Sequence, residues 1–134
     1  MTTVNPAAIA PPMGAFSHVA ILPHTYTAAY ISGQIGADVT GELVSENCYE
    51  QTLQAFANIE AIVSHLDVDP SAIVKLLTLV VGTDGFTEFA RARDEVFRRW
   101  YPTSRYPAHS AATVSELAAP GLKVEIEAVV ALPR

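Results

Sequence analysis

Apolar side chains recur at two different spacings along this chain, and the change of spacing predicts where strands and helices lie. Residues 19–22 and 26–32 are rich in Val, Ile, Thr and Tyr, as strands usually are, and we interpret them as a hairpin or two adjacent strands. Between residues 47 and 66 the apolar positions fall three or four apart, which predicts a helix. This stripe consists of Tyr49, Leu53, Phe56, Ile59, Val63 and Leu66.

The middle of the chain predicts a buried strand followed by a second helix. Residues 74–81, VKLLTLVV, are almost continuously apolar, as expected for a central strand buried on both faces. Asp69 and Pro70 precede it and are suited to cap and begin a short helical turn. A helix is then expected over residues 85–100, capped by Thr83 or Asp84.

Two further strands are predicted near the C-terminus, over residues 109–115 and 123–131, with a turn at 118–121. Period-two alternation places His109 and Ala111 on one face of the first strand, and it places Glu125 and Glu127 on one face of the second. If the two strands pair, a histidine and one or two carboxylates come together on rigid structure. We therefore expect a functional site here.

The resulting order, β-β-α-β-α-β-β, predicts an α+β two-layer sandwich with both helices on one face of a mixed sheet. A length of 134 residues fits a single domain, 1–134, whose Pro-rich residues 1–14 we interpret as an extended arm. Half of the residues are apolar and only 16% are charged. We therefore expect the second sheet face to be buried between copies of the chain in a homo-oligomer.

Charge and cysteine content narrow the classes of function. A net charge of -6 with only eight Lys and Arg residues disfavours a nucleic-acid partner. Cys48 is the only cysteine, which excludes an intrachain disulfide and fits a reducing cytoplasm. From the N-terminal residues we expect neither a signal peptide nor a membrane anchor. The sequence shows no nucleotide-binding loop and no pair of histidines at a spacing typical of metal ligands. We expect a cytoplasmic protein without a cofactor or metal.

Several segments, taken in order and spacing, match a known family. They are GAFSHV, YISGQIG with the later TGELV, the helix start near Glu50, VKLLTLVV, VFRRWYP, and YPAHS followed by KVEIEAVVA. In these segments, from about Gly14 to Val130, the chain resembles the RidA/YjgF family of reactive-intermediate deaminases, also called the endoribonuclease L-PSP family. The resemblance implies a chorismate-mutase-like homotrimer with a central barrel of strands and three clefts, each lined by two subunits.

The resemblance also implies site residues. The family positions that line the cleft correspond to Phe16, Ser32, Gly33, Asp94 and Glu125.

The family motif PAR[ST] reads Pro107-Ala108-His109-Ser110 here, so that His109 replaces the arginine that clamps the substrate carboxylate. Ala111 is a further candidate for substrate binding. Arg105 could supply the missing cation, or it is a surface charge. Arg93, like Asp94, either touches the ligand or is solvated.

The resemblance implies hydrolytic deamination of a small imine, enamine or unsaturated acid, with Glu125 and His109 as catalytic residues. Glu125 would orient the attacking water, while Gly33 and His109 hold the substrate. The alternative is a non-catalytic ligand-binding or regulatory trimer, in which His109 is an interface histidine and Glu125 belongs to an ion pair. A ribonuclease is disfavoured by the acidic balance, and chorismate mutase is similar in fold alone.

Overall fold

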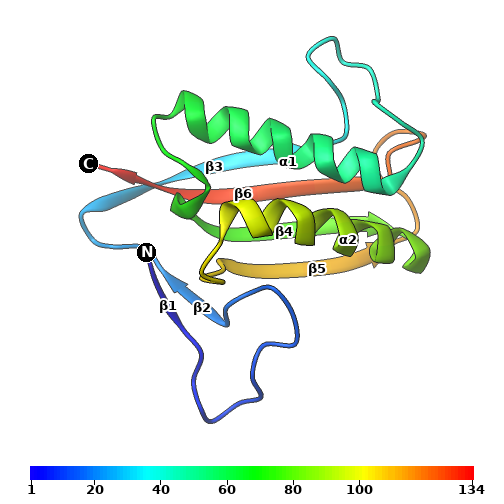
Figure 1. Cartoon of the computed structure of the whole chain (residues 1–134). Helices are drawn as coiled ribbons and strands as arrows, with labels where there is room; N and C mark the ends of the chain where they lie inside the picture. Colours follow the sequence, from blue (N-terminus) through cyan, green and yellow to red (C-terminus); the bar gives the residue numbers. More distant parts are fainter.

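The computed structural model describes residues 1–134 and has two helices packed on a sheet (Figure 1). The elements follow the chain as β1 (Thr2–Val4), β2 (Val19–Ile21), β3 (Tyr26–Gln34), α1 (Cys48–His65), the 3-10 turn η1 (Pro70–Ala72), β4 (Ile73–Val81), α2 (Thr83–Trp100), β5 (Ala108–Val114) and β6 (Val124–Pro133). The predicted α+β order is confirmed, with β1 as an additional strand inside the expected arm.

The four-stranded sheet has the order β3-β6-β4-β5. β4 is parallel to β5 and antiparallel to β6, so the two C-terminal strands do not pair with each other, and the condition set for the expected site is not met. The chain leaves β5 and crosses the end of β4, where Val81 N donates to Lys123 O and Gly82 N donates to Val114 O. β4, the most apolar segment, lies between the two C-terminal strands. The central position predicted for it from the sequence is therefore confirmed.

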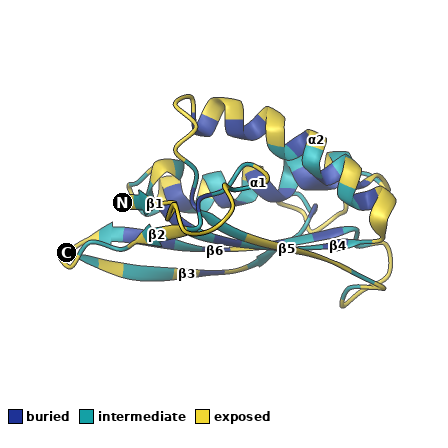
Figure 2. Cartoon of the chain, turned by 90° about the horizontal axis from the view of Figure 1, so that it is seen from below, coloured by how far each residue is buried: buried dark blue, intermediate teal, exposed yellow.

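Both helices cover one face of this sheet, and the opposite face is bare in the single chain (Figure 2). Along β4 the alternate side chains Leu76, Thr78 and Val80 are fully buried beneath the helices. Leu77, Leu79 and Val81 are only partly buried on the other face. The expectation that this strand is buried on both faces is therefore wrong for the isolated chain, because no layer covers the second face.

The N-terminal strands form a separate two-stranded sheet. β2 pairs with β1 and not with β3, so the predicted pairing of residues 19–22 with 26–32 is wrong. Thr2 pairs with Ile21 and Val4 with Val19 in this small sheet. Ser17, just before β2, forms a parallel bridge to Ala108 at the start of β5. The segment around residue 16 therefore lies along the edge of the main sheet at β5.

The predicted limits of the helices hold to within two residues, but one cap differs. α1 covers 48–65 and α2 covers 83–100. Gly82, with φ of 74°, is the N-cap of α2 in place of Thr83 or Asp84, because L-residues rarely adopt such a backbone. Asp69 caps η1 as expected, accepting from Ser71 N at 2.8 Å. Neither helix is both long and apolar enough to cross a membrane.

Candidate functional site

Glu125 and Gly33 touch across strands β6 and β3. A β-carbon built on Gly33 would lie 2.0 Å from Glu125 Oε2, far inside any permitted contact. The pairing of β3 with β6 shifts between Ile31 and Gln34, so an irregularity in the strand lies at this point. The carboxylate can therefore lie against the main chain of β3 only because residue 33 has no side chain. Ser32, the preceding candidate, is exposed.

His109 lies on the helix-covered side of the sheet. It is paired in register with the fully buried Leu76, and its ring meets those of two α2 residues. The ring centroids are 6.2 Å from Phe89 and 6.4 Å from Phe97. Its Nε2 is 2.8 Å from Thr78 Oγ1, a buried hydroxyl on β4. Two aromatic rings and one hydrogen bond thus fix the orientation of the imidazole.

The environment of His109 keeps the imidazole uncharged. Burial, with smaller contributions from the positive charges of Arg93 and Lys75, lowers the pKa of His109 to about 4. Its Nδ1 makes no hydrogen bond, and no buried side-chain polar atom in the chain lacks a partner, so Nδ1 reaches solvent. Near neutral pH His109 can therefore exchange one hydrogen bond with a ligand, but it cannot supply a positive charge.

Phe16 and Asp94 lie on the same side of the molecule as His109. Phe16 precedes Ser17, whose Oγ donates to Tyr106 O at 2.6 Å beside the start of β5. Asp94 borders a cavity of about 290 Å³ between α2 and the loop before β5. The other residues around this cavity are Ala15, Phe97, Arg98, Tyr101, Pro102, Ser104 and Tyr106. Ala111 is exposed on β5, the outer strand of the sheet.

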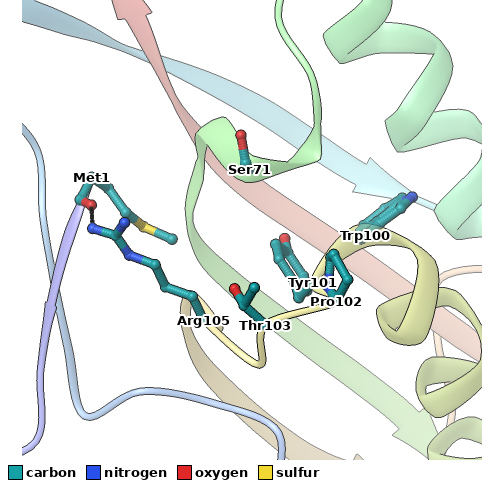
Figure 3. Close-up of a pocket in the computed structure, with 7 residues that line it drawn as sticks. All are labelled: Met1, Ser71, Trp100, Tyr101, Pro102, Thr103 and Arg105. Atoms are coloured by element: carbon teal, nitrogen blue, oxygen red, sulfur yellow. Dashed lines mark hydrogen bonds between the residues drawn. The ribbon is translucent and has the colours of Figure 1, made fainter.

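Arg105 is directed toward Met1 at the N-terminus (Figure 3). It is exposed, and its Nη2 donates to the carbonyl oxygen of Met1. Arg105 and Met1 border a separate cavity of about 290 Å³ together with Ser71, Trp100, Tyr101, Pro102 and Thr103. None of its hydrogen bonds goes to His109. Its role as a carboxylate anchor stays a prediction.

The structure therefore divides the candidate residues of one chain into two groups. Glu125 is paired with Leu79 and faces the bare side of the sheet, whereas His109 faces the helices. β4 separates the His109 strand β5 from the Glu125 strand β6, which amounts to about 10 Å across the sheet at the usual strand spacing. The expectation that the C-terminal strands bring His109 and Glu125 together is wrong within one chain.

Thr78 is the contact that the sequence analysis missed. It is the one hydroxyl in the run VKLLTLVV, and it is fully buried. A lone polar residue in a central strand needs a partner, which is a signal that could have been used to find it. Nowhere does the structure bring together three or more His, Cys, Asp or Glu side chains that could hold a metal ion.

Comparisons with known proteins agree with this geometry. Among curated proteins, the 2-iminobutanoate/2-iminopropanoate deaminase of Capra hircus is 33% identical over 129 residues, which cover 96% of this chain and 85% of the relative. The RutC family protein y4sK of Sinorhizobium fredii is 36% identical over 104 residues, covering 77% and 78% of the two chains.

Solved structures show the same fold. The crystal structure of YyfB from Yersinia pestis, described as a protein of unknown function of the conserved Rid protein family, matches with a TM-score of 0.84 at 29% identity, covering 98% of both chains. RidA from Psychrobacter sp. matches with a TM-score of 0.65 at 29% identity, covering 97% of this chain and 98% of the other.

The family model described as Endoribonuclease L-PSP matches residues 7–132, nearly the whole chain. This match is accompanied by four features of the structure: the strand order, the two helices on one sheet face, the close contact of Glu125 with Gly33, and the position of His109 at the start of β5. The chain therefore belongs to the Endoribonuclease L-PSP family, the RidA/YjgF family that its sequence motifs resemble.

Proposed function

We propose that this protein is a hydrolase that deaminates small 2-imino acids to 2-keto acids. The observation that carries the proposal is the Glu125 carboxylate held against the partly buried glycine of β3, where a ligand can meet both an acceptor and the main chain. Similarity to proteins named 2-iminobutanoate/2-iminopropanoate deaminase supports the choice of substrate class.

The reaction needs one water and no redox partner. An iminium carboxylate, R–C(=NH2+)–COO−, and water give the keto acid, R–C(=O)–COO−, and NH4+. Glu125 would accept a hydrogen bond from the attacking water and turn its lone pair toward the imine carbon. The main chain beside Gly33 would hold the substrate at that point. Both protons of the water pass to the departing nitrogen, the first when water adds to the imine carbon and the second when the resulting hydroxyl collapses to the ketone and the C–N bond breaks.

We propose that each complete site forms between two copies of the chain in a homotrimer. Glu125 lies on the inner strand β6 beside the edge strand β3 and faces the bare side of the sheet, whereas His109 lies on the other edge strand, β5, and faces the helices, so neither reaches the other within the chain. The bare sheet face also carries the partly buried apolar side chains of Leu77 and Leu79, which a neighbouring copy could cover. Tyr30, which is paired with Val129 there, is 82% exposed in the single chain. An assembly would bury this surface and join the two groups.

A second function, a ligand-binding trimer without deaminase activity, is favoured by one observation. The neutral His109 replaces a permanently charged, two-pronged arginine. Removing one partner of a buried charged pair typically costs about 2–5 kcal/mol, which is roughly 30-fold to several thousandfold in binding. If no other group supplies the lost charge, the cleft would bind its ligand without useful catalysis.

The test is a hydrolysis assay with 2-iminobutanoate, or with 2-aminoacrylate that tautomerises to its imine. We expect the native protein to release ammonia and the Glu125→Gln variant to lose about 100-fold or more of that activity. An inactive native protein with an active His109→Arg variant would support the ligand-binding function instead. Full activity in Glu125→Gln would remove Glu125 from the mechanism.

The cytoplasmic location expected from the single Cys48 stays a prediction.

A further inference from the structure

We propose that Arg93 on α2 is the cation that binds the substrate carboxylate on the His109 side of the cleft. This inference rests on the proposed function, since it concerns the same site and the same class of acid. The sequence analysis left Arg93 open as either a solvated or a ligand-contacting side chain. The contacts of the helix favour the second interpretation.

An acid substrate needs a positive charge in this site. The chain carries a net charge of -6, and Glu125 adds a carboxylate to the proposed site itself. His109 is neutral near pH 7 because burial holds its pKa at about 4. A second anion entering the cleft would therefore meet uncompensated repulsion unless a Lys or Arg lies close by.

Most of the other cations in the chain contact groups away from the His109 ring. Arg99 binds Glu60, Arg105 binds the Met1 carbonyl, and Arg134 binds the Tyr26 carbonyl. Arg91 lies over the Tyr49 ring, with its guanidinium carbon 3.8 Å from the ring centroid, and so it faces α1. Lys75 donates to Ser110 at 2.8 Å.

Arg93 differs from these because it packs against the same aromatic ring as His109. Its guanidinium carbon is 5.7 Å from the centroid of the Phe89 ring, and the same ring is 6.2 Å from that of His109. Only 18% of the Arg93 side chain is exposed, compared with 56% for Asp94 and 63% for Arg99. A guanidinium screened from water in this way attracts an anion more strongly than a fully solvated one.

Arg93 also keeps hydrogen-bonding capacity for a ligand. Its Nε and Nη2 both donate to Asp94 Oδ1, at 3.2 and 3.1 Å. Nη1 has no partner, and because no buried side-chain polar atom is unpaired, this nitrogen reaches solvent. Asp94 is more than half exposed, so water screens this ion pair and the pair contributes little on its own.

The experiment measures equilibrium binding of 2-oxobutanoate and of its uncharged analogue 2-oxobutanamide to the full-length protein by calorimetry. Arg93→Gln removes the charge, Arg93→Lys keeps the charge without the fork, and Arg91→Gln is the matched control on the same helix. Arg98→Gln tests the cation beside the cavity that Asp94 borders. Thermal unfolding of each variant is recorded alongside.

We expect Arg93→Gln to weaken 2-oxobutanoate binding by about 10- to 100-fold, as for a hydrogen bond to a charged group, and to leave the amide nearly unchanged. Arg93→Lys should lie between this variant and the native protein, and Arg91→Gln should match the native protein. Unchanged acid binding in Arg93→Gln would overturn the inference. So would equal loss of acid and amide, which would mark Arg93 as structural, or a loss confined to Arg98→Gln.

The imine assay separates this inference from the proposed function. A native protein that binds 2-oxobutanoate through Arg93 but hydrolyses no imino acid would contradict the deaminase function and support the Arg93 site. An active native protein whose Arg93→Gln variant keeps acid binding and activity would support the deaminase function and contradict the Arg93 site.

Discussion

Gly33 leaves the space that the Glu125 carboxylate occupies, and a single methyl group would fill it. In Gly33→Ala the new carbon would lie 2.0 Å from Oε2 and 2.6 Å from Cγ, so the whole Glu125 side chain must turn away. Because small displacements of positioned groups can cost about 100-fold in rate, we expect a loss of that order in kcat/KM for imine hydrolysis. The free energy of unfolding should fall by no more than about 1–3 kcal/mol.

Gly14→Ala is the matched control for this substitution. A β-carbon at Gly14 would lie 3.5 Å from the Phe16 ring, an ordinary contact. We expect its activity and its unfolding free energy to match those of the native protein. Native-like kinetics in Gly33→Ala, with the variant fully folded, would show that the Glu125 position is not needed for turnover.

The buried imidazole of His109 makes stability depend on pH. Because its folded-state pKa is about 4 and the unfolded value about 6.5, only the unfolded chain takes up a proton between these values. Stability is therefore full above pH 6.5 and is lost as the pH falls toward 4. Between pH 7 and pH 5 we expect a loss of about 2 kcal/mol from this group.

Urea denaturation at several pH values and one fixed protein concentration measures this effect. His109→Gln should remove the slope between pH 7 and pH 5, whatever its overall stability. A variant with the same slope as the native protein would place the pH dependence on other groups.

At this scale the sequence predicts the identities of the site residues better than their contacts. The motif around Lys123 to Ala131 singled out Glu125, and YPAHS singled out His109. Neither motif reveals that the two side chains face opposite sides of the sheet, because alternation along a strand does not say which face the helices cover.

One helix residue, Gln51, connects α1 to two loops. It is fully buried, and its Nε2 donates to the carbonyls of Ser45 and Gly121, both at 2.9 Å. Its Oε1 accepts from Lys123 N at 2.9 Å. Gln51→Leu would remove three hydrogen bonds to partly buried main-chain groups, and a group left without a partner costs up to about 1–3 kcal/mol. We expect the largest loss of unfolding free energy among single substitutions on this helix.

Urea denaturation compares Gln51→Leu with Gln54→Leu. Gln54 is less buried and donates only to Asn58 on the next turn, so its loss should cost about 0.5 kcal/mol or less. Equal losses in the two variants would refute a special role for Gln51.

Helix and strand limits follow from periodicity, but strand pairing does not. The spacing of apolar residues placed α1 and α2 within two residues of their observed ends. The same reasoning paired β5 with β6 and β2 with β3, since neighbours in sequence often pair. The parallel pairing of β4 with β5 instead requires a crossover through α2, and only the whole set of elements determines which edge each strand takes.

For the whole molecule, the bare sheet face and the divided site lead to one expectation about assembly. A sheet covered on a single face leaves Leu77 and Leu79 only partly buried, beside Glu127 and Glu125 on the neighbouring strand. Composition alone indicated an oligomer, because 50% apolar residues exceed what one small domain can bury easily. The sequence could not show which residues meet across the interface, since that depends on the geometry of both outer strands.

Subunit mixing tests whether each site draws on two chains. Glu125→Gln inactivates the half of the site on β6, and His109→Phe removes the imidazole from the half on β5. Each homotrimer should be inactive, whereas co-expressed chains form mixed trimers. With random assembly, about a quarter of the clefts receive an intact Glu125 from one chain and an intact His109 from its neighbour. We therefore expect mixed trimers to regain about a quarter of native activity in the imine assay.

The control is a mixture of the two purified homotrimers, which should stay inactive for as long as the subunits do not exchange. Chains carrying both substitutions, co-expressed with the native chain, provide a second comparison, because there every intact cleft needs two native neighbours. If the mixed trimers of the two single variants showed no activity, both halves of the site would have to come from the same chain. The His109 and Glu125 side chains would then have to meet within one chain, although the sheet holds them on different strands.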